Sequence, residues 1–91
     1  MDRLESMAIF LAVVDEGGFA AAARKMKISP PVVTRAVSDL EAAIGVRLLT
    51  RTTRIVRVTD VGARYAEDCR RVLADVTEME DLAAGAHGAV R

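Results

Sequence analysis

Two consecutive prolines define where a helix must begin near the middle of this 91-residue chain. Ser29 is a favourable N-cap residue, and Pro30 and Pro31 fit the first helical turn because the N–H groups of that turn have no intrahelical partners. Gly45 accepts the left-handed backbone conformation that commonly ends a helix. The pattern therefore predicts a helix over residues 30–44.

This helix is predicted to have a buried face and a presented face, because successive residues are rotated by about 100° around a helix. The side chains predicted to be buried are Val33, Val37, Leu40 and Ile44. The side chains predicted to be presented are Pro31, Arg35, Ser38 and Ala42.

Two further helices are predicted before this one. Asp2, with Glu5 three residues later, forms a capping-box pattern ahead of an amphipathic stretch that stops at a pair of glycines. A short helix over residues 19–26 contains four successive alanines, which favour the helix and allow another helix to approach closely. With a tight turn at residues 27–28, the second and third helices form a helix-turn-helix.

The pattern changes after the third helix. Residues 46–49 and 55–58 are β-branched, partly alternating runs on either side of the polar and basic segment 50–54, which predicts a two-stranded hairpin. Thr59 is predicted to cap a last helix, which ends near Gly85.

Apolar side chains of the last helix recur at alternating steps of four and three residues, which is typical of a coiled-coil seam. A helix of this length extends roughly 35–40 Å, more than so small a domain can cover. We expect a homodimer, with packing on an absent C-terminal domain as the alternative. The predicted interface consists of Tyr65, Cys69, Val72, Val76, Met79 and Ala83.

Cys69 and His87 are the only residues of their types, which excludes an internal disulfide and a Cys/His zinc site. Cys69 is interpreted as a small buried hydrophobe rather than a reactive thiol. Without a phosphate-cradling glycine loop or a nucleophile pair, the sequence predicts no enzyme, no cofactor and no metal site. Because neither a membrane span nor a signal peptide is evident, we expect a cytoplasmic protein at the nucleoid.

The formal net charge is zero, but the charges are unevenly distributed. Residues 24–57 hold eight basic and two acidic side chains, whereas the segments before and after them are both acidic. A basic middle between acidic ends indicates a surface that faces a polyanion.

In a helix-turn-helix, the N-terminal residues of the second helix meet base edges in the major groove. Arg35 can donate two hydrogen bonds to O6 and N7 of guanine, and Thr34 can bond to a base or a phosphate. The contacts predicted from this helix are Pro30, Pro31, Val32, Thr34, Arg35 and Ser38.

Basic residues outside this helix are predicted to add affinity that falls with salt. Arg51 and Arg54 in the wing reach the adjacent minor groove or its phosphates, and Lys25 and Lys27 flank the turn near the DNA backbone. The predicted function is sequence-specific binding of double-stranded operator DNA.

Several alternatives stay open. Arg35 could pair with Asp39 one turn later, and Asp39 either orients Arg35 or accepts a hydrogen bond from a cytosine amine. The part of the wing around Arg51 could face the domain instead of DNA. A protein-interaction module that never meets DNA is the alternative function, supported by the zero net charge and the acidic last helix.

The chain resembles the N-terminal domain of LysR-type transcriptional regulators of bacteria. The resemblance depends on the order and spacing of several runs: Leu4-Glu5-Ser6-Met7-Ala8-Ile9-Phe10, Gly18-Phe19-Ala20-Ala21-Ala22-Ala23, Ile28-Ser29-Pro30-Pro31-Val32-Val33-Thr34-Arg35-Ala36-Val37, Leu40-Glu41, Gly45-Val46-Arg47-Leu48-Leu49 and the segment from Arg51 to Gly62.

The resemblance implies an antiparallel pairing of two last helices, a tetramer in the full-length protein, and a C-terminal domain that binds a small-molecule effector. It also assigns base or backbone contacts to the start of the recognition helix and a wing contact to Arg54. Three residues depart from the family pattern: Pro30 replaces a common glutamine, Gly18 a common serine and Thr53 a common glycine.

The predicted fold is mainly α: a winged helix-turn-helix of three helices and a two-stranded β-hairpin wing, followed by a long linker and dimerisation helix. The expected division is a DNA-binding domain over residues 1–58 and a linker helix over 59–85. Residues 86–91 are expected to be a truncated tail toward an absent effector-binding domain.

Overall fold

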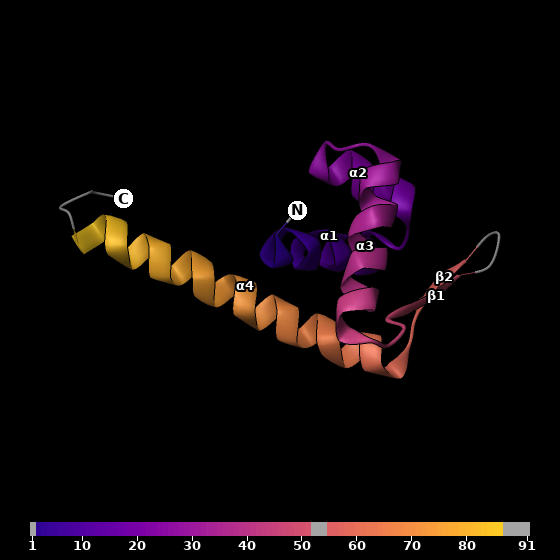
Figure 1. Cartoon of the computed structure of the whole chain (residues 1–91). Coiled ribbons are helices and arrows are strands. Elements are labelled where there is room, and N and C mark those ends of the chain that lie inside the picture. The colour runs from indigo at the N-terminus through magenta and orange to yellow at the C-terminus, as the bar shows by residue number, and fades with distance from the viewer. Residues whose placement is uncertain (1, 52–54, 87–91) are drawn as a thin grey trace.

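The computed structural model describes residues 2–51 and 55–86. Figure 1 shows three helices packed together, a hairpin at one end and a long helix that leaves the group. In chain order the elements are α1 (Arg3–Glu16), α2 (Phe19–Met26), α3 (Pro30–Ile44), β1 (Leu49–Arg51), β2 (Val56–Val58) and α4 (Asp60–Ala86). The mainly helical fold with a hairpin wing is as predicted.

The predicted caps set the ends of the first two helices. The Asp2 carboxylate accepts from the Glu5 N–H at 2.7 Å, and the Glu5 carboxylate accepts from the Asp2 N–H at 3.2 Å, which completes the capping box. Gly17 ends α1 with a φ of 80°. Lys27 ends α2 with a φ of 60°, a left-handed conformation that favours glycine, and begins the predicted tight turn.

Helix α3 begins and ends where the sequence predicted, at Pro30 and Ile44. Ser29 occupies the N-cap position with an extended backbone, but its hydroxyl makes no capping hydrogen bond within the described part of the chain. Gly45 closes the helix with a φ of 87°. The backbone of this segment therefore follows the proline and glycine signals.

The core lies where α1, α2 and α3 meet. Phe10, Val13 and Leu40 are among its largest fully buried side chains, and Ala22 and Ala23 let α2 approach closely. The predicted buried face of α3 is confirmed for Val33, Val37 and Leu40. Ile44 is a wrong prediction, since it lies in the last turn and is 37% exposed, while Ala36 is buried instead.

The wing is shorter and shifted relative to the prediction. Leu49 pairs with Val58, Thr50 with Arg57 and Arg51 with Val56 in an antiparallel register. The strand predicted over residues 46–49 is wrong at its start, because Val46 and Arg47 are exposed in the connection after α3. Conversely, Thr50 and Arg51, predicted in the loop, belong to β1.

Helix α4 divides into a docked first part and a projecting second part (Figure 1). Cys69 is 1% exposed in the core, and Tyr65 packs beside Phe10 with the ring centroids 5.8 Å apart. Farther along, Met79 is 63% exposed, and the helix continues to Ala86, slightly beyond the predicted end. No helix in the described ranges has the length and apolarity needed to cross a membrane.

This division corrects the predicted seam. Its first three residues, Tyr65, Cys69 and Val72, pack into or against the core of their own chain. Cys69 is fully buried where α4 contacts α1, whereas Tyr65 and Val72 are half-buried there. Three residues of the predicted seam lie beyond it: Val76, Met79 and Ala83.

Candidate nucleic-acid interface

The exposed surface of α3 begins at its first turn. Pro30, Pro31, Arg35 and Ser38 are exposed, as their predicted role requires. Val32 and Thr34 are half-buried, so they present less surface than their neighbours. The opposite face of α3 is buried, and its side chains anchor the helix to the core.

Arg35 has no acidic partner among the described residues, so the predicted alternative of a pair with Asp39 is not formed there. Asp39 instead borders a hollow of about 210 Å³ together with Arg3 and Ser6 of α1 and Ala43 of α3. The guanidinium of Arg35 is therefore available to an external acceptor.

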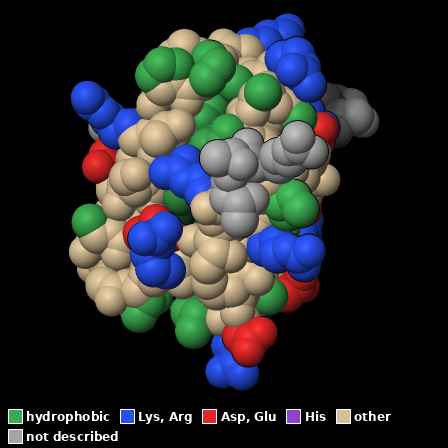
Figure 2. Space-filling view, turned by 90° about the vertical axis from the view of Figure 1, so that its right-hand side faces the viewer, with side chains coloured by type: hydrophobic (Ala, Val, Ile, Leu, Met, Phe, Trp, Pro, Cys, Tyr) green, Lys and Arg blue, Asp and Glu red, His purple; other side chains and the backbone are tan. Residues whose placement is uncertain are grey.

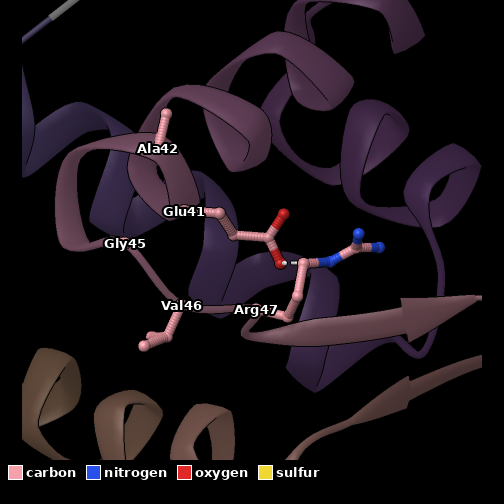
Figure 3. Close-up of a pocket in the computed structure, with 5 residues that line it drawn as sticks. All are labelled: Glu41, Ala42, Gly45, Val46 and Arg47. Carbon is pink, nitrogen blue, oxygen red and sulfur yellow. Dashed lines mark ion pairs between the residues drawn. The ribbon is translucent and has the colours of Figure 1, made fainter.

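The carboxylate of Glu41, near the end of α3, holds the beginning of the wing. It accepts hydrogen bonds from the N–H of Leu48 at 2.7 Å and of Leu49 at 3.1 Å, and Arg47 Nε lies 3.7 Å from the same oxygen. Figure 3 shows Glu41 and Arg47 facing each other beside an open hollow of about 300 Å³. One acidic side chain thus fixes residues 47–49, which we call the wing root, relative to α3.

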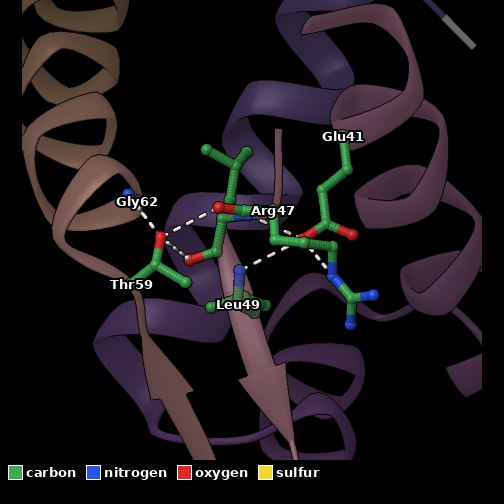
Figure 4. Close-up of polar contacts among 6 residues, drawn as sticks. Glu41, Arg47, Leu49, Thr59 and Gly62 are labelled. Carbon is green, nitrogen blue, oxygen red and sulfur yellow. Dashed lines mark hydrogen bonds and ion pairs between the residues drawn. The ribbon is translucent and has the colours of Figure 1, made fainter. Parts of the chain in front are cut away.

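Thr59 joins the wing root to α4 (Figure 4). Its hydroxyl donates to the carbonyl oxygens of Arg47 and Leu48 at 2.9 and 3.2 Å, and accepts from the Gly62 N–H at 2.8 Å. A Cβ at Gly62 would overlap the Leu48 carbonyl oxygen, so glycine is needed for this close approach. The predicted N-cap role of Thr59 is confirmed.

The wing also touches α2. The guanidinium carbon of Arg51 lies 4.7 Å from the centroid of the Phe19 ring, at the N-terminal end of α2. This contact joins Arg51 to the domain, but Arg51 remains exposed, so the contact does not exclude the predicted contact with DNA. Arg54 and Thr53, the other residues singled out in the wing, lie outside the described residues.

Basic side chains are spread over the end of the molecule that carries α3 and the wing, both at its margin and near its centre (Figure 2). Lys27 is exposed at the turn, as is Lys25, whose Nζ lies 3.8 Å from a Glu16 carboxylate oxygen. A partly exposed pair of this length is weak and leaves Lys25 largely available.

Helix α4 is fastened to α1 by an ion pair. Two Arg70 nitrogens donate to the two Asp15 carboxylate oxygens at 3.0 and 3.1 Å. This hydrogen bonding from Arg70 lowers the pKa of Asp15 below its ordinary value. The pair therefore favours the charged form of Asp15 and links α4 to α1 at the surface.

Burial raises the pKa of the Cys69 thiol, which keeps it protonated near neutral pH. This confirms that Cys69 is a buried hydrophobe and not an exposed reactive thiol. Burial likewise raises the pKa of Tyr65 beside it.

Three residues that organise the interface were not predicted to do so: Glu41, Phe19 and Gly62. Glu41 is one of only two acidic residues in the basic segment 24–57, and that exception was a usable signal. The position of Phe19 above Arg51 has no local signal, since the two residues are brought together only by the tertiary fold.

The sequence of this chain is similar to those of known bacterial regulatory proteins. Residues 4–63 match the family model described as bacterial regulatory helix-turn-helix protein, lysR family. The HTH-type transcriptional activator AaeR of Escherichia coli (strain K12) is 40% identical over 81 residues, which are 89% of this chain and 26% of that protein. This chain thus spans about a quarter of the length of that relative.

Solved structures share the fold over nearly the whole chain. A crystal structure of a BenM_DBD/catB site 1 DNA complex has a TM-score of 0.91 and 30% identity, and the match covers 100% of each chain. A crystal structure of a CbnR_DBD–DNA complex has a TM-score of 0.89 and 36% identity, with 96% of this chain and 99% of that chain covered. Both of these similar proteins were crystallised with DNA.

Proposed function

Because this chain belongs to the lysR family of bacterial regulatory helix-turn-helix proteins, we propose that it binds double-stranded operator DNA sequence-specifically as a dimer. Helix α3 is the recognition helix in the major groove, and the wing contacts the adjacent minor groove or the phosphate backbone. The protein acts as a transcriptional regulator in the cytoplasm, at the nucleoid, and not as an enzyme.

The observation that carries this proposal is the exposed guanidinium of Arg35, which has no ion pair within residues 2–51 and 55–86, on a helix whose opposite face is buried. An arginine in this setting can donate two parallel hydrogen bonds to O6 and N7 of guanine. Thr34 and Ser38 can add contacts to a base or the backbone, and the ring surfaces of Pro30 and Pro31 can pack on a thymine methyl group, with Val32 beside them.

The remaining contacts supply affinity without sequence choice. Lys25, Lys27, Arg51 and Arg54 neutralise phosphates, so binding weakens as salt rises, with a slope of about −0.9 per phosphate contact. The basic end seen in Figure 2 supports this assignment, although the net charge of the chain is zero.

The dimer forms through the projecting part of α4. Val76, Met79 and Ala83 lie on one side of this helix, and Met79 is 63% exposed. Residues 1–58 are the DNA-binding unit and residues 59–85 the linker helix. The chain matches about a quarter of the length of a relative, and we further propose that the whole protein is a tetramer with an effector-binding domain, toward which residues 86–91 form a tail.

Titration of labelled duplex DNA tests the function directly. Random-sequence duplexes are selected on the protein, and the affinity for the recovered duplex is compared with that for a scrambled duplex at several salt concentrations. The proposal requires tighter binding to the selected duplex and a steep salt dependence for both. A protein-interaction module, the alternative, would show neither, and heparin would not compete for its surface.

A further inference from the structure

We propose that Phe19 positions Arg51 for DNA binding, by stacking against its guanidinium and holding the outer end of β1 beside the start of α2. This inference rests on the proposed function, because it assigns a role to a residue that does not itself need to touch DNA. The observation behind it is the distance of 4.7 Å between the Arg51 guanidinium carbon and the Phe19 ring centroid.

A two-stranded hairpin is marginal by itself, so the contact at Arg51 adds to the packing of Val56 and Val58 that holds β2 against the core. Each strand has only three residues, and the Glu41 carboxylate fixes β1 only at its root, through Leu48 and Leu49. Arg51 is the last residue of β1 and pairs with Val56, so a contact at Arg51 restrains both strands at the end farthest from that root.

Phe19 is a suitable partner because its ring is itself held in place. It is half-buried and packs against the core, immediately after the N-cap of α2. A guanidinium is planar and weakly hydrated, so it stacks on an aromatic face and keeps its N–H groups directed outward in its own plane. Arg51 has no ion pair among the described residues, so these donors stay available to phosphate oxygens.

A double-mutant cycle tests the coupling. The affinity for the duplex selected by the wild-type protein is measured for wild type, Phe19→Leu, Arg51→Ala and the double variant. Leucine preserves apolar packing but removes the ring face, so Phe19→Leu should weaken binding about two- to five-fold, as expected for loss of one cation–π contact. In the Arg51→Ala background the same change should have almost no effect.

Arg57 supplies the matched control, since it is an exposed arginine on the neighbouring strand, opposite Thr50. Combined with Arg57→Ala, the Phe19→Leu change should keep its full effect. Equal effects of Phe19→Leu in the wild-type and Arg51→Ala backgrounds would overturn the proposal, because the ring would then act independently of Arg51.

Two further readouts separate positioning from loss of fold. Arg51→Lys keeps the charge and replaces an exposed side chain, and it should still weaken binding about two- to five-fold because a compact, hydrated ammonium stacks less well. In the DNA-free protein, the δ-proton resonances of Arg51 should show a ring-current shift that Phe19→Leu abolishes.

The NMR shift also distinguishes this inference from the proposed function. A wild-type protein that shows the shift but binds no duplex would contradict the proposed function and remove the role in DNA binding with it. A protein that binds the selected duplex without the shift, or with a shift unchanged in Phe19→Leu, would contradict only the role of Phe19.

Discussion

Glu41 of α3 accepts a 2.7 Å hydrogen bond from the backbone N–H of Leu48, at the point where the wing begins. The same oxygen accepts from Leu49, and the carbonyl of Leu48 in turn accepts from Thr59 at the start of α4. The recognition helix, the wing and the linker helix are therefore joined at one residue of the chain (Figure 4). Disturbing this joint should alter both the stability of the fold and the placement of the wing.

Replacing Glu41 by alanine should destabilise the fold by about 2–3 kcal/mol, because two backbone N–H groups lose a charged acceptor in a partly buried place. Glu41→Gln retains an acceptor oxygen and should cost about half as much. Urea denaturation followed by circular dichroism measures both values. Equal losses for the two variants would show that the charge, and not the hydrogen-bond geometry, matters.

Gly62→Ala should destabilise the protein by about 3 kcal/mol, since its Cβ would overlap the backbone carbonyl of Leu48. Gly18→Ser is the control: apart from its chain neighbours, no described atom lies within 4 Å of the position a Cβ would take, and its φ is extended. Serine also caps helices well, so this control should leave the stability unchanged or slightly raised. A tolerated Gly62→Ala would mean that α4 can move away from the wing root.

The Asp15–Arg70 ion pair predicts a pH dependence. Because Arg70 lowers the pKa of Asp15 in the folded protein, the pair stabilises the fold above the ordinary aspartate pKa, and this stabilisation is lost as pH falls through the lowered value. Wild type should therefore be slightly more stable than Asp15→Asn at pH 7, and the difference should disappear as the pH falls from the ordinary aspartate pKa through the lowered value. Melting curves across this range measure it, and high salt should reduce the difference at pH 7.

Arg35→Ala should weaken binding to the selected duplex by about 1–3 kcal/mol and reduce discrimination against substitutions at one base pair. Lys27→Gln removes a charge without a predicted base contact, so it should weaken all duplexes alike and lower the salt slope by about 1. Fluorescence anisotropy on a panel of single-substitution duplexes compares them. If the two variants exchanged these behaviours, the recognition role would belong to the turn.

Val76→Glu should separate the proposed dimer, because it places a charge on the side of α4 that also carries Met79. Ala74→Glu introduces the same side chain on the opposite side of the same helix and should leave the dimer intact. Sedimentation at tens of micromolar, a concentration range suited to modest interfaces, shows the association state. The helicity of both variants should match wild type, since neither the half-buried Val76 nor the exposed Ala74 belongs to the core or packs against it.

The ends of the helices follow from local signals in the sequence. The capping box at Asp2, the prolines that begin α3, and the left-handed residues Gly17 and Gly45 each act within one turn of the chain. Such interactions are local, so the residues that make them are close in sequence and can be recognised there. Helical periodicity likewise identified most of the buried face of α3 and its exposed opposite side.

Only the tertiary structure decided which residues of the apolar stripe on α4 are buried within their own domain. Periodicity placed Cys69 and Val76 on one stripe, but the crossing of α4 over α1 buried the first inside its own domain and left the second beyond it. The Arg51–Phe19 stack and the Glu41 joint are also long-range. The residues in each contact meet because helix packing brings segments together that are far apart in the sequence. Periodicity predicts the direction in which each side chain points, but it does not predict which surface will cover that side chain.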